Sequence, residues 1–389
     1  MRADVHAIAL PRIMRIGAGA LDDLPQALAQ LGLGRPAVVT DRFIAHSGAL
    51  ARLKAGLGNA GIEVRVFADA VPDPTVASVV AATAFIGEGG HDCVIGLGGG
   101  SPIDTAKAAA VLSLRGGEMA SLKAPHQEDA PGLPIVAIPT TAGTGSEATR
   151  FTIVTDERTD EKMLCAGLAY LPSIAIVDYE LTLTKPYRLI ADTGIDALTH
   201  AIEAYVSRRA NPFTDALALS AAKTIWNNLP TACNEPGNRA AREAMMLAAT
   251  QAGIAFSNAS VALVHGMSRP IGAHFHVAHG LSNAMLLPAV SEWSAAGAPA
   301  RYAAISGALG LAGDGDDDEV AASRLTAALR QLNHDLQVPT PQAYGIDERK
   351  WKDVLPLMAE QALASGSPAN NPRVPDAMTI QDLYRRAWA

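Results

Sequence analysis

The sequence has few cysteines and lacks segments typical of secreted or membrane proteins. Its three cysteines, Cys93, Cys165 and Cys233, are scattered and show no CxxC spacing. This pattern argues against a disulfide framework and fits a reducing compartment, so we expect a cytoplasmic protein. The first residues contain no basic patch followed by an apolar run and a small-residue cleavage site, which argues against a signal peptide.

Long apolar runs and basic clusters are also missing. No stretch of about 18 uninterrupted apolar residues occurs, so no membrane span and no membrane partner are expected. The formal net charge is −8 and no block of Lys and Arg appears, which argues against nucleic acid as a partner. Aromatic residues make up only 5% of the chain. Ala and Gly are abundant instead, which favours closely packed helices.

What is present indicates a globular protein of about two domains. The chain has 389 residues, of which 49% are hydrophobic and 18% charged, and a domain typically takes roughly 150 residues. Short apolar runs alternate with helical patterns in the first half, with strands expected at 35–41, 62–69, 91–101 and 133–141. This alternation predicts a parallel sheet covered on both faces. After residue 185 the strand signals disappear, so the sequence predicts an α/β dinucleotide-binding domain over 1–185 and an all-helical domain over 186–389.

Four residues of the second half indicate a metal site. Asp196 and His200 are four residues apart in a segment expected to be helical, so both side chains point from one helix face. His265 and His279 open and close a second segment. One carboxylate oxygen and three imidazole nitrogens suit a divalent first-row metal such as Fe²⁺ or Zn²⁺, with a position left for substrate. Taken singly, each histidine is better explained by a structural hydrogen bond than by metal binding.

Two polar loops of the first half follow expected strands. Consecutive glycines allow a ligand to approach the backbone, and the start of a helix offers N–H groups to phosphate. Loops at the ends of neighbouring parallel strands form a crevice that suits a dinucleotide. Alternatively, both are ordinary strand-to-helix turns. The residues expected to bind the cofactor here are Gly98, Gly99, Gly100 and Ser101 in the first loop, and Thr140, Thr141 and Thr144 in the second.

An acidic residue at the end of an expected strand bears on which dinucleotide binds. Asp41 can accept hydrogen bonds from the adenosine ribose and would repel a 2′-phosphate, which favours NAD. Its neighbour Arg42 leaves NADP open as an alternative. Asp41 is explained equally well as the capping residue of a helix.

The motifs together resemble the iron-containing (group III) alcohol dehydrogenases. The resemblance lies in GGGSPIDTAK (98–107), PTTAGTGSE (139–147), GIDALTHAIEAYVS (194–207) and LVHGMSRPIGAHFHVAHGLSNAMLLP (263–288). It implies a dehydroquinate synthase-like architecture, with metal ligands Asp196, His200, His265 and His279. It further implies that the GGGS turn binds pyrophosphate, that the threonine-rich loop lies beside nicotinamide and ribose, and that Asp104 and Lys162 belong to the cofactor site.

The resemblance also implies a reaction, a substrate class and an assembly. The expected reaction is the metal-dependent, NAD(P)-linked interconversion of a small alcohol or hydroxy compound and its aldehyde or ketone by hydride transfer. Phe151 and Phe256 match positions that line the substrate pocket in diol oxidoreductases. A homodimer or a larger homo-oligomer is implied as well.

One residue departs from the pattern of the family. Many members carry a histidine four residues after the third metal ligand, and here this position is Arg269. An arginine stays charged and does not serve readily as a general acid or base. Its guanidinium suits a carboxylate, sulfonate or phosphonate, so the substrate is expected to include compounds with an acidic group. The alternative is a salt bridge within the helical domain, for example with Glu203.

Two other reactions compete with this interpretation. A metal-independent reductase of an unsaturated keto acid, as in the maleylacetate reductases, would fit Arg269 but not four intact ligands. A dehydroquinate synthase-like lyase would carry Glu in place of Asp196 and a dense set of Lys and Arg, which this sequence lacks.

Overall fold

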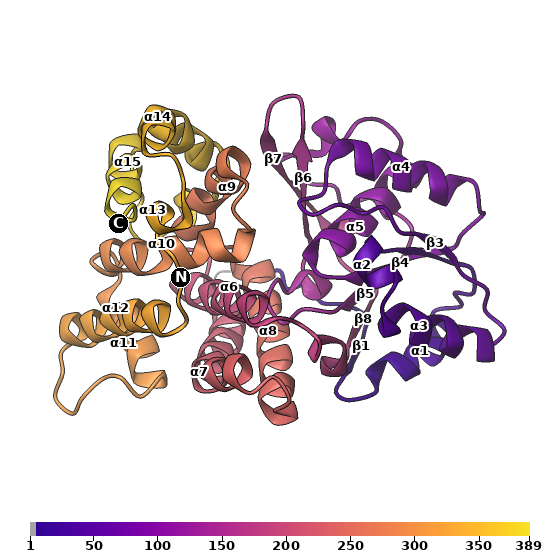
Figure 1. Ribbon diagram of the computed structural model, residues 1–389, viewed down its shortest axis with the longest axis horizontal. Helices are drawn as coiled ribbons and strands as arrows, with labels where there is room; N and C mark the ends of the chain where they lie inside the picture. Colours follow the sequence, from indigo (N-terminus) through magenta and orange to yellow (C-terminus); the bar gives the residue numbers. More distant parts are fainter. Residues whose placement is uncertain (1–4) are drawn as a thin grey trace. The chain divides into compact units, whose positions relative to one another are not determined.

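The computed structural model describes residues 5–389, whose course is drawn in Figure 1. Contacts divide the chain into two compact units. The α/β unit consists of Ile8–Lys185 and Gly237–Gly253, and the helical unit of Pro186–Pro236, Ile254–Ala389 and the described part of Met1–Ala7. The chain thus passes from one unit to the other after Lys185, where the sequence predicts its domain boundary. The assignment of residues 1–185 and 186–389 to two separate domains stays a prediction.

A six-stranded parallel sheet organises the α/β unit, in the order β1-β8-β5-β4-β2-β3. Its strands are β1 (Ile13–Ile16), β2 (Pro36–Val39), β3 (Arg65–Phe67), β4 (Cys93–Gly98), β5 (Ile135–Pro139) and β8 (Ile174–Val177). Every residue of β2, β4, β5 and β8 is buried, as expected for parallel strands covered on both faces. The predicted parallel α/β sheet is therefore confirmed.

Helices cover both faces of this sheet because successive side chains of a strand point to opposite sides. Ile95 and Leu97 of β4 pack with the apolar residues of α1 and α3, whereas Val94 packs with those of α4 and α5. The helices are α1 (Leu24–Gln30), α2 (Arg42–Ala45), α3 (Gly48–Asn59), α4 (Val76–Gly87) and α5 (Gly100–Arg115). An antiparallel hairpin of β6 (Phe151–Asp156) and β7 (Glu161–Ala166) completes the unit (Figure 1).

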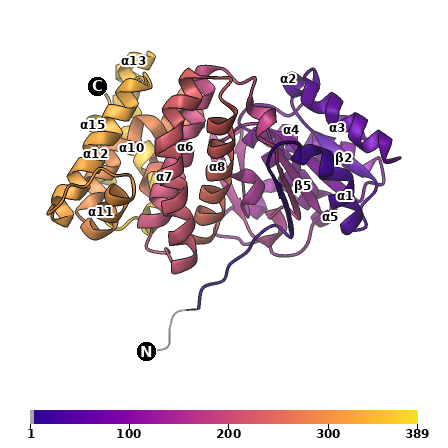
Figure 2. The same cartoon turned by 90° about the horizontal axis from the view of Figure 1, so that it is seen from below.

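The helical unit contains no strand among the residues that the structure describes, in agreement with the predicted all-helical second half. Pairs of consecutive helices, α6 with α7 and α11 with α12, lie side by side (Figure 2). Its helices are α6 (Tyr187–Val206), α7 (Pro212–Asn234), α9 (Leu263–Phe275), α10 (His279–Ala295), α11 (Pro299–Ala308), α12 (Asp318–Asp335), α13 (Pro341–Tyr344), α14 (Glu348–Ala364) and α15 (Ala377–Arg386).

Helix α8 (Arg239–Ala259) contributes to both units, and its first part contacts the threonine-rich loop of the α/β unit. Gly145 of that loop has φ +61°, a conformation that L side chains rarely adopt, and it meets Gly253 of α8. A Cβ atom on Gly145 would lie 2.5 Å from the Cα of Gly253, so only glycine allows this contact. The contact fixes where the threonine-rich loop runs.

Within residues 5–389, no single helix has the length and apolar character needed to cross a membrane; α8 and α9 pass that test only as a pair, and the pair is bent by 104°.

Candidate functional site

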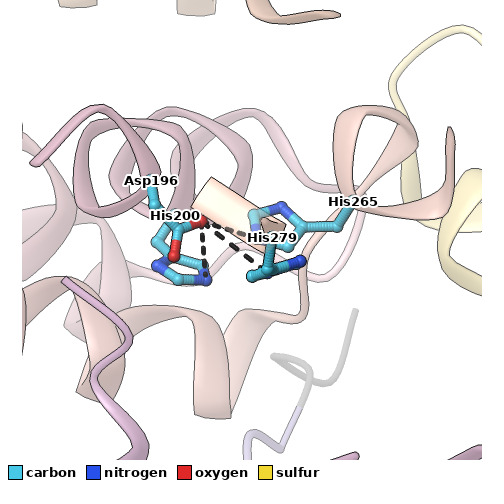
Figure 3. Close-up of side chains that lie close together, drawn as sticks. All are labelled: Asp196, His200, His265 and His279. Atoms are coloured by element: carbon cyan, nitrogen blue, oxygen red, sulfur yellow. Dashed lines mark ion pairs between the residues drawn. The ribbon is translucent and has the colours of Figure 1, made fainter. Parts of the chain in front are cut away.

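The four predicted metal ligands come together in the helical unit (Figure 3). Asp196 and His200 lie on successive turns of α6, as their spacing predicts. His265 lies in the first turn of α9, and His279 is the first residue of α10. The local helix geometry aligns the first pair, and the packing of α6, α9 and α10 supplies the other two.

The spacing of the donor atoms suits one ion. The Oδ1 atom of Asp196 lies 3.8 Å from Nε2 of His200, 3.5 Å from Nε2 of His265 and 3.8 Å from Nε2 of His279. Four donors at about 2.1 Å from one ion would be about 3.4 Å apart in a tetrahedron. Three of the residues are buried, while the side chain of His279 is 38% exposed. The donor set therefore fits a divalent metal that is reached from the side of His279.

The electrostatics of the cluster favour a cation. Burial alone would raise the pKa of Asp196, but the imidazoles of His200, His279 and His265 lower it below its ordinary value. The carboxylate therefore stays ionised at neutral pH and can neutralise part of the charge of a bound ion.

Glu203, one turn after His200 on α6, orients the third ligand. Its carboxylate accepts a hydrogen bond of 2.7 Å from Nδ1 of His265 and further bonds from the backbone N–H groups at the start of α9. With the proton held on Nδ1, the lone pair of Nε2 faces the ligand cluster. From the sequence, Glu203 is predicted only as a possible salt-bridge partner of Arg269. Its position three residues after His200 is the signal that would have placed it on the ligand-bearing face.

Asn283 is a second functional residue that the sequence reasoning missed. It lies one turn after His279 on α10 and is fully buried. Its Nδ2 donates to Oδ1 of Asp196 at 2.6 Å, and lies 3.1 Å from Nε2 of His265 and 3.3 Å from Nε2 of His279. The spacing of four residues from His279 would have indicated a shared helix face.

The predicted pocket residues have different surroundings. The ring of Phe256 stacks on the imidazole of His200, with centroids 4.2 Å apart. Phe151 begins β6 in the α/β unit, where its carbonyl accepts a hydrogen bond from Lys107. A role for either in binding substrate stays a prediction.

Arg269 lies one turn after His265 on α9 and is buried. Its Nη1 donates to Oγ of Ser367 at 3.2 Å. Burial lowers the pKa of Arg269 to about 10, and the nearby charge of Glu203 raises it, so the guanidinium stays protonated at neutral pH. Among the residues that the structure describes, no carboxylate forms an ion pair with it. The expected alternative of a salt bridge with Glu203 is therefore not observed.

The glycine-rich turn joins β4 to α5. Gly98 has φ +153°, and Gly99 caps α5 without a side-chain hydrogen bond. Gly100 lies against the threonine-rich loop, since a Cβ there would be 3.0 Å from Cγ2 of Thr144. The two predicted cofactor loops are thus adjacent.

Two buried hydroxyl groups of the threonine-rich loop form no hydrogen bond with the described residues. The Oγ1 atoms of Thr140 and Thr141 are buried and have no hydrogen-bond partner among residues 5–389. A buried polar group without a partner costs about 1–3 kcal/mol. A polar ligand between these loops would remove that cost, so the loops fit a dinucleotide. Oγ of Ser101 already accepts a bond from the backbone N–H of Asp73.

Half-buried Asp104 and fully buried Lys107 of α5 form hydrogen bonds that support the two loops. Asp104 accepts hydrogen bonds from Ser146 Oγ at 2.6 Å and from the Ile153 N–H at 3.0 Å, so both oxygens are used within the protein. Lys107 Nζ donates to Thr149 and to the carbonyl of Phe151. The geometry makes Asp104 an organiser of the threonine-rich loop, and its contact with the cofactor stays a prediction.

The two remaining cofactor candidates also have protein partners. Asp41 caps α2 by accepting from the N–H of Ile44 at 2.8 Å, as its alternative interpretation predicts. Only Oδ1 takes part in this bond. Lys162 forms an ion pair of 2.9 Å with Asp73, and its side chain is largely buried. Neither arrangement tests the predicted contact with the cofactor.

Comparison with known proteins identifies the family. A family model described as iron-containing alcohol dehydrogenase matches residues 11–179, and the C-terminal model of the Fe-containing alcohol dehydrogenase family matches residues 190–388. The chain is 35% identical over 379 residues to the NAD-dependent methanol dehydrogenase of Bacillus methanolicus, covering 97% of this chain and 98% of that one.

Two further relatives agree. The NADPH-dependent butanol dehydrogenase of Clostridium saccharobutylicum is 37% identical over 373 residues, covering 94% of this chain and 93% of that one. The crystal structure of a 1,3-propanediol oxidoreductase has a TM-score of 0.94 and 34% identity, covering 99% of this chain and 100% of that chain.

The fold, the Asp/His metal site and these matches define an NAD(P)-linked alcohol oxidoreductase. The chain belongs to the iron-containing alcohol dehydrogenase family. The resemblance, the enzyme class and the two-part fold predicted from the sequence are confirmed.

Proposed function

We propose that this enzyme interconverts a small alcohol and its aldehyde with NAD, using one divalent metal, Fe²⁺ or Zn²⁺, held by Asp196, His200, His265 and His279. The observation that carries the proposal is the convergence of these four donor atoms within 4.8 Å of one another. Four intact ligands disfavour a metal-independent keto-acid reductase, and the family disfavours a lyase of the dehydroquinate synthase type.

The protein's own groups prepare this chemistry. When bound, the metal supplies Lewis acidity and the nicotinamide supplies hydride chemistry. Asp196 contributes negative charge that holds the ion. Glu203 keeps a proton on Nδ1 of His265, which leaves Nε2 free to bind. Phe256 covers one face of His200 and limits water there. Arg269 retains its proton at neutral pH and so does not exchange it with substrate.

The cofactor is proposed to bind along the two loops of the α/β unit. The turn from Gly98 to Ser101 would face the pyrophosphate, because the start of α5 offers backbone N–H groups. Thr140 and Thr141 would hydrogen-bond the nicotinamide half through hydroxyls that have no partner in the described part of the chain. The relatives include both NAD- and NADPH-dependent enzymes, so the choice between them depends on local charge.

Asp41 is proposed to favour NAD by repelling a 2′-phosphate. Arg42 does not offset this charge within the protein, since its guanidinium pairs with Asp69. The unaltered enzyme should therefore have a higher kcat/KM with NAD than with NADP, and Asp41→Gly should narrow the ratio several-fold. Equal use of both cofactors by the unaltered enzyme would refute this assignment. Asp69→Gly is a control that releases Arg42 while keeping Asp41.

Arg269 narrows the proposed substrate class. Among residues 5–389, the only side-chain hydrogen bond of this buried guanidinium is to Ser367. A buried charge without a counter-charge is costly unless an anion approaches it. A substrate with a carboxylate or sulfonate would supply that anion. We therefore include small hydroxy acids and their aldehydes among the proposed substrates.

The decisive test is a turnover screen of metal-reconstituted protein. Apoprotein loaded with Fe²⁺ or Zn²⁺ should oxidise members of a panel of alcohols, diols and hydroxy acids, followed by NADH absorbance. His265→Ala should lose bound metal and activity together, whereas His334→Ala, which alters a histidine whose side chain is 83% exposed, should change neither. Unaltered protein that binds no metal, or turnover that survives chelation, would refute the proposal.

Location and assembly complete the proposal. The three free, buried cysteines fit a reducing cytoplasm. A homodimer or larger homo-oligomer is expected, and light scattering that gives the mass of one chain would rule it out.

A further inference from the structure

Ser367 and Arg269 form a buried pair of hydrogen-bond donors in the helical unit. Ser367 begins the short 3-10 helix η6 (Ser367–Asn370), and its Oγ accepts a bond of 3.2 Å from Nη1 of Arg269. Ser367 is 4% exposed and Arg269 is 9% exposed. Arg269 lies one turn after the metal ligand His265 on α9, and residues four apart share one face of a helix. The pair is therefore close to the proposed metal centre.

The hydroxyl of Ser367 carries a proton that no described residue accepts. An arginine donates hydrogen bonds and accepts none, so the bond from Arg269 occupies a lone pair of Oγ and leaves the O–H unused. No acceptor for this O–H is found within residues 5–389, whereas the backbone N–H of Ser367 donates to Oγ of Ser365 at 3.3 Å. The guanidinium has five N–H donors, and only Nη1 donates to a described residue. Two neighbouring groups thus offer donors for the same acceptor.

Packing against the start of α9 holds the hydroxyl in place. A Cβ atom on Gly266 of α9 would lie 2.8 Å from Cδ of Pro368, so the helix η6 approaches α9 where a side chain is missing. At the other end of η6, Nδ2 of Asn370 donates to Oγ of Ser260 at 3.0 Å. Because η6 is fixed at both ends, the Ser367 hydroxyl has a defined position beside the guanidinium.

The charges around the pair leave room for an anion. The carboxylate of Glu203 is engaged by Nδ1 of His265 and by backbone N–H groups at the start of α9. A carboxylate or sulfonate has two or three oxygens, so it can accept a charge-assisted bond from the guanidinium and a second bond from the hydroxyl. The uncharged chain of a plain alcohol has no such acceptor and leaves both donors unpaired.

We propose that Ser367 is a specificity-determining residue whose hydroxyl binds the acidic group of the substrate together with Arg269. The inference rests on the proposed function, in which small hydroxy acids and their aldehydes are among the substrates. Two donors in fixed positions select an anion with several oxygens over a single-atom anion such as chloride. The acidic group is thus recognised by its shape as well as by its charge.

The test compares Ser367→Ala with Ser306→Ala in the metal-loaded enzyme. Ser306 is a fully buried serine of the helical unit, and its hydroxyl also has no partner among the described residues. It lies on α11, which carries none of the four proposed metal ligands. KM and kcat are measured for a hydroxy acid and for a neutral alcohol of equal length.

A second measurement follows binding without turnover. Methanesulfonate has no hydroxyl to oxidise, so it serves as a probe for the anion site. Its binding is measured as competitive inhibition against the hydroxy acid and as a rise in the temperature of thermal unfolding, since a ligand that binds only the folded protein stabilises it. Chloride at the same concentration is the control for ionic strength.

We expect Ser367→Ala to lower the ratio of kcat/KM for the hydroxy acid to kcat/KM for the neutral alcohol about tenfold, mainly through KM, because one hydrogen bond to a charged group is lost. The inhibition constant of methanesulfonate should rise by a similar factor. Ser367→Thr keeps the hydroxyl and should retain part of the preference, which keeps the test decisive if the alanine variant does not fold. Ser306→Ala should behave like the unaltered enzyme.

The outcomes separate this inference from the proposed function. An equal change for both substrates in Ser367→Ala, or methanesulfonate binding that this variant leaves unchanged, would overturn the role of Ser367. Stabilisation by chloride equal to that by methanesulfonate would overturn it as well. If the metal-loaded unaltered enzyme oxidises neither alcohols nor hydroxy acids, the proposed function fails instead, and the unfolding temperatures with methanesulfonate still decide whether Ser367 binds the anion.

Discussion

The metal centre and the cofactor loops of this enzyme are built in different ways. At the metal centre, function rests on side chains of three helices, and Glu203 and Asn283 hydrogen-bond to His265 and Asp196 of the four donors. In the cofactor loops, function is proposed to rest largely on the backbone of the glycine-rich turn, which half-buried Asp104 and buried Lys107 support through hydrogen bonds. A site built from side chains loses function when a ligand residue is substituted. A site built from backbone is sensitive instead to substitutions that fill the space beside it or remove the hydrogen bonds that hold it in place.

The support of the cofactor loops should show a distinct pH dependence. Burial lowers the pKa of Lys107 to about 8 from 10.5. Between these values the unfolded chain holds a proton that the folded chain has released, so the free energy of unfolding rises with pH through this window. The shift corresponds to at most about 3 kcal/mol. The stability of the unaltered protein relative to Lys107→Met should therefore increase from pH 7.5 to pH 10.5 in urea unfolding.

The control for this experiment is a lysine that is exposed, unlike Lys107. Lys54 lies on the exposed side of α3, and Lys54→Met should show no such pH dependence relative to the unaltered protein. A difference between Lys107→Met and unaltered protein that stays constant from pH 7.5 to pH 10.5 would show that Lys107 does not titrate in this window.

The support of the metal centre should affect metal binding more than folding. In Glu203→Gln the charge is lost, and the amide no longer fixes the proton on Nδ1 of His265. We expect metal affinity to fall about 10–100-fold, measured by titration with a competing chelator. Glu292→Gln, at a half-exposed surface pair with Arg330, should leave affinity unchanged. If Glu203→Gln lowers cofactor affinity and leaves metal affinity unchanged, Glu203 does not act on the metal centre as proposed.

Substitution of Arg269 tests whether this residue, close to the metal ligand His265 on α9, binds an acidic group of the substrate. Removing a hydrogen bond to a charged group costs about 1.5–3 kcal/mol, so Arg269→Ala should raise KM for an acidic substrate at least about tenfold and change KM for a neutral alcohol of equal length little. Steady-state kinetics with matched pairs of substrates measures this. Arg269→Lys keeps the charge and should retain part of the preference. A higher kcat/KM for neutral alcohols than for their acidic counterparts in the unaltered enzyme would refute the proposed role of Arg269.

The smallest effect is expected where only space is altered. In Gly100→Ala the new Cβ would meet Thr144 at 3.0 Å, so the threonine must shift by a few tenths of an ångström. We expect KM for the dinucleotide to rise about fivefold, corresponding to about 1 kcal/mol, with metal content unchanged. Gly56→Ala on α3 meets no atom within 4 Å and is the matched control. If Gly100→Ala lowers metal affinity instead, the two regions are not independent.

The same contrast explains what the sequence could reveal. Asp196 and His200 are predictable because a spacing of four defines one face of any helix. Strands β2, β4 and β5 are predictable because buried parallel strands are continuous apolar runs. Strands β1 and β8 have four residues each and were not expected. The roles of Glu203 and Asn283 depend on how α6, α9 and α10 pack, which no local pattern contains.

The surroundings of the cofactor loops are also hard to predict from the sequence, because they depend on how distant segments pack. Asp104 is assigned to the cofactor site by the family resemblance alone. In the structure its carboxylate accepts hydrogen bonds from Ser146 and Ile153, and its contact with the cofactor stays a prediction. Helix α8 lies within the predicted range 186–389. Its first part packs on the threonine-rich loop of the α/β unit, because Gly145 and Gly253 allow the two backbones to touch.

That contact between Gly145 and Gly253 limits the evolutionary paths open to the enzyme. Either glycine, changed alone, would place a Cβ within 2.5 to 2.8 Å of the other backbone. No compensating change exists at the partner position, because no residue is smaller than glycine. A lineage can therefore diversify its substrate or its metal around this point by single substitutions, while a change at either glycine must await a prior movement of the backbone.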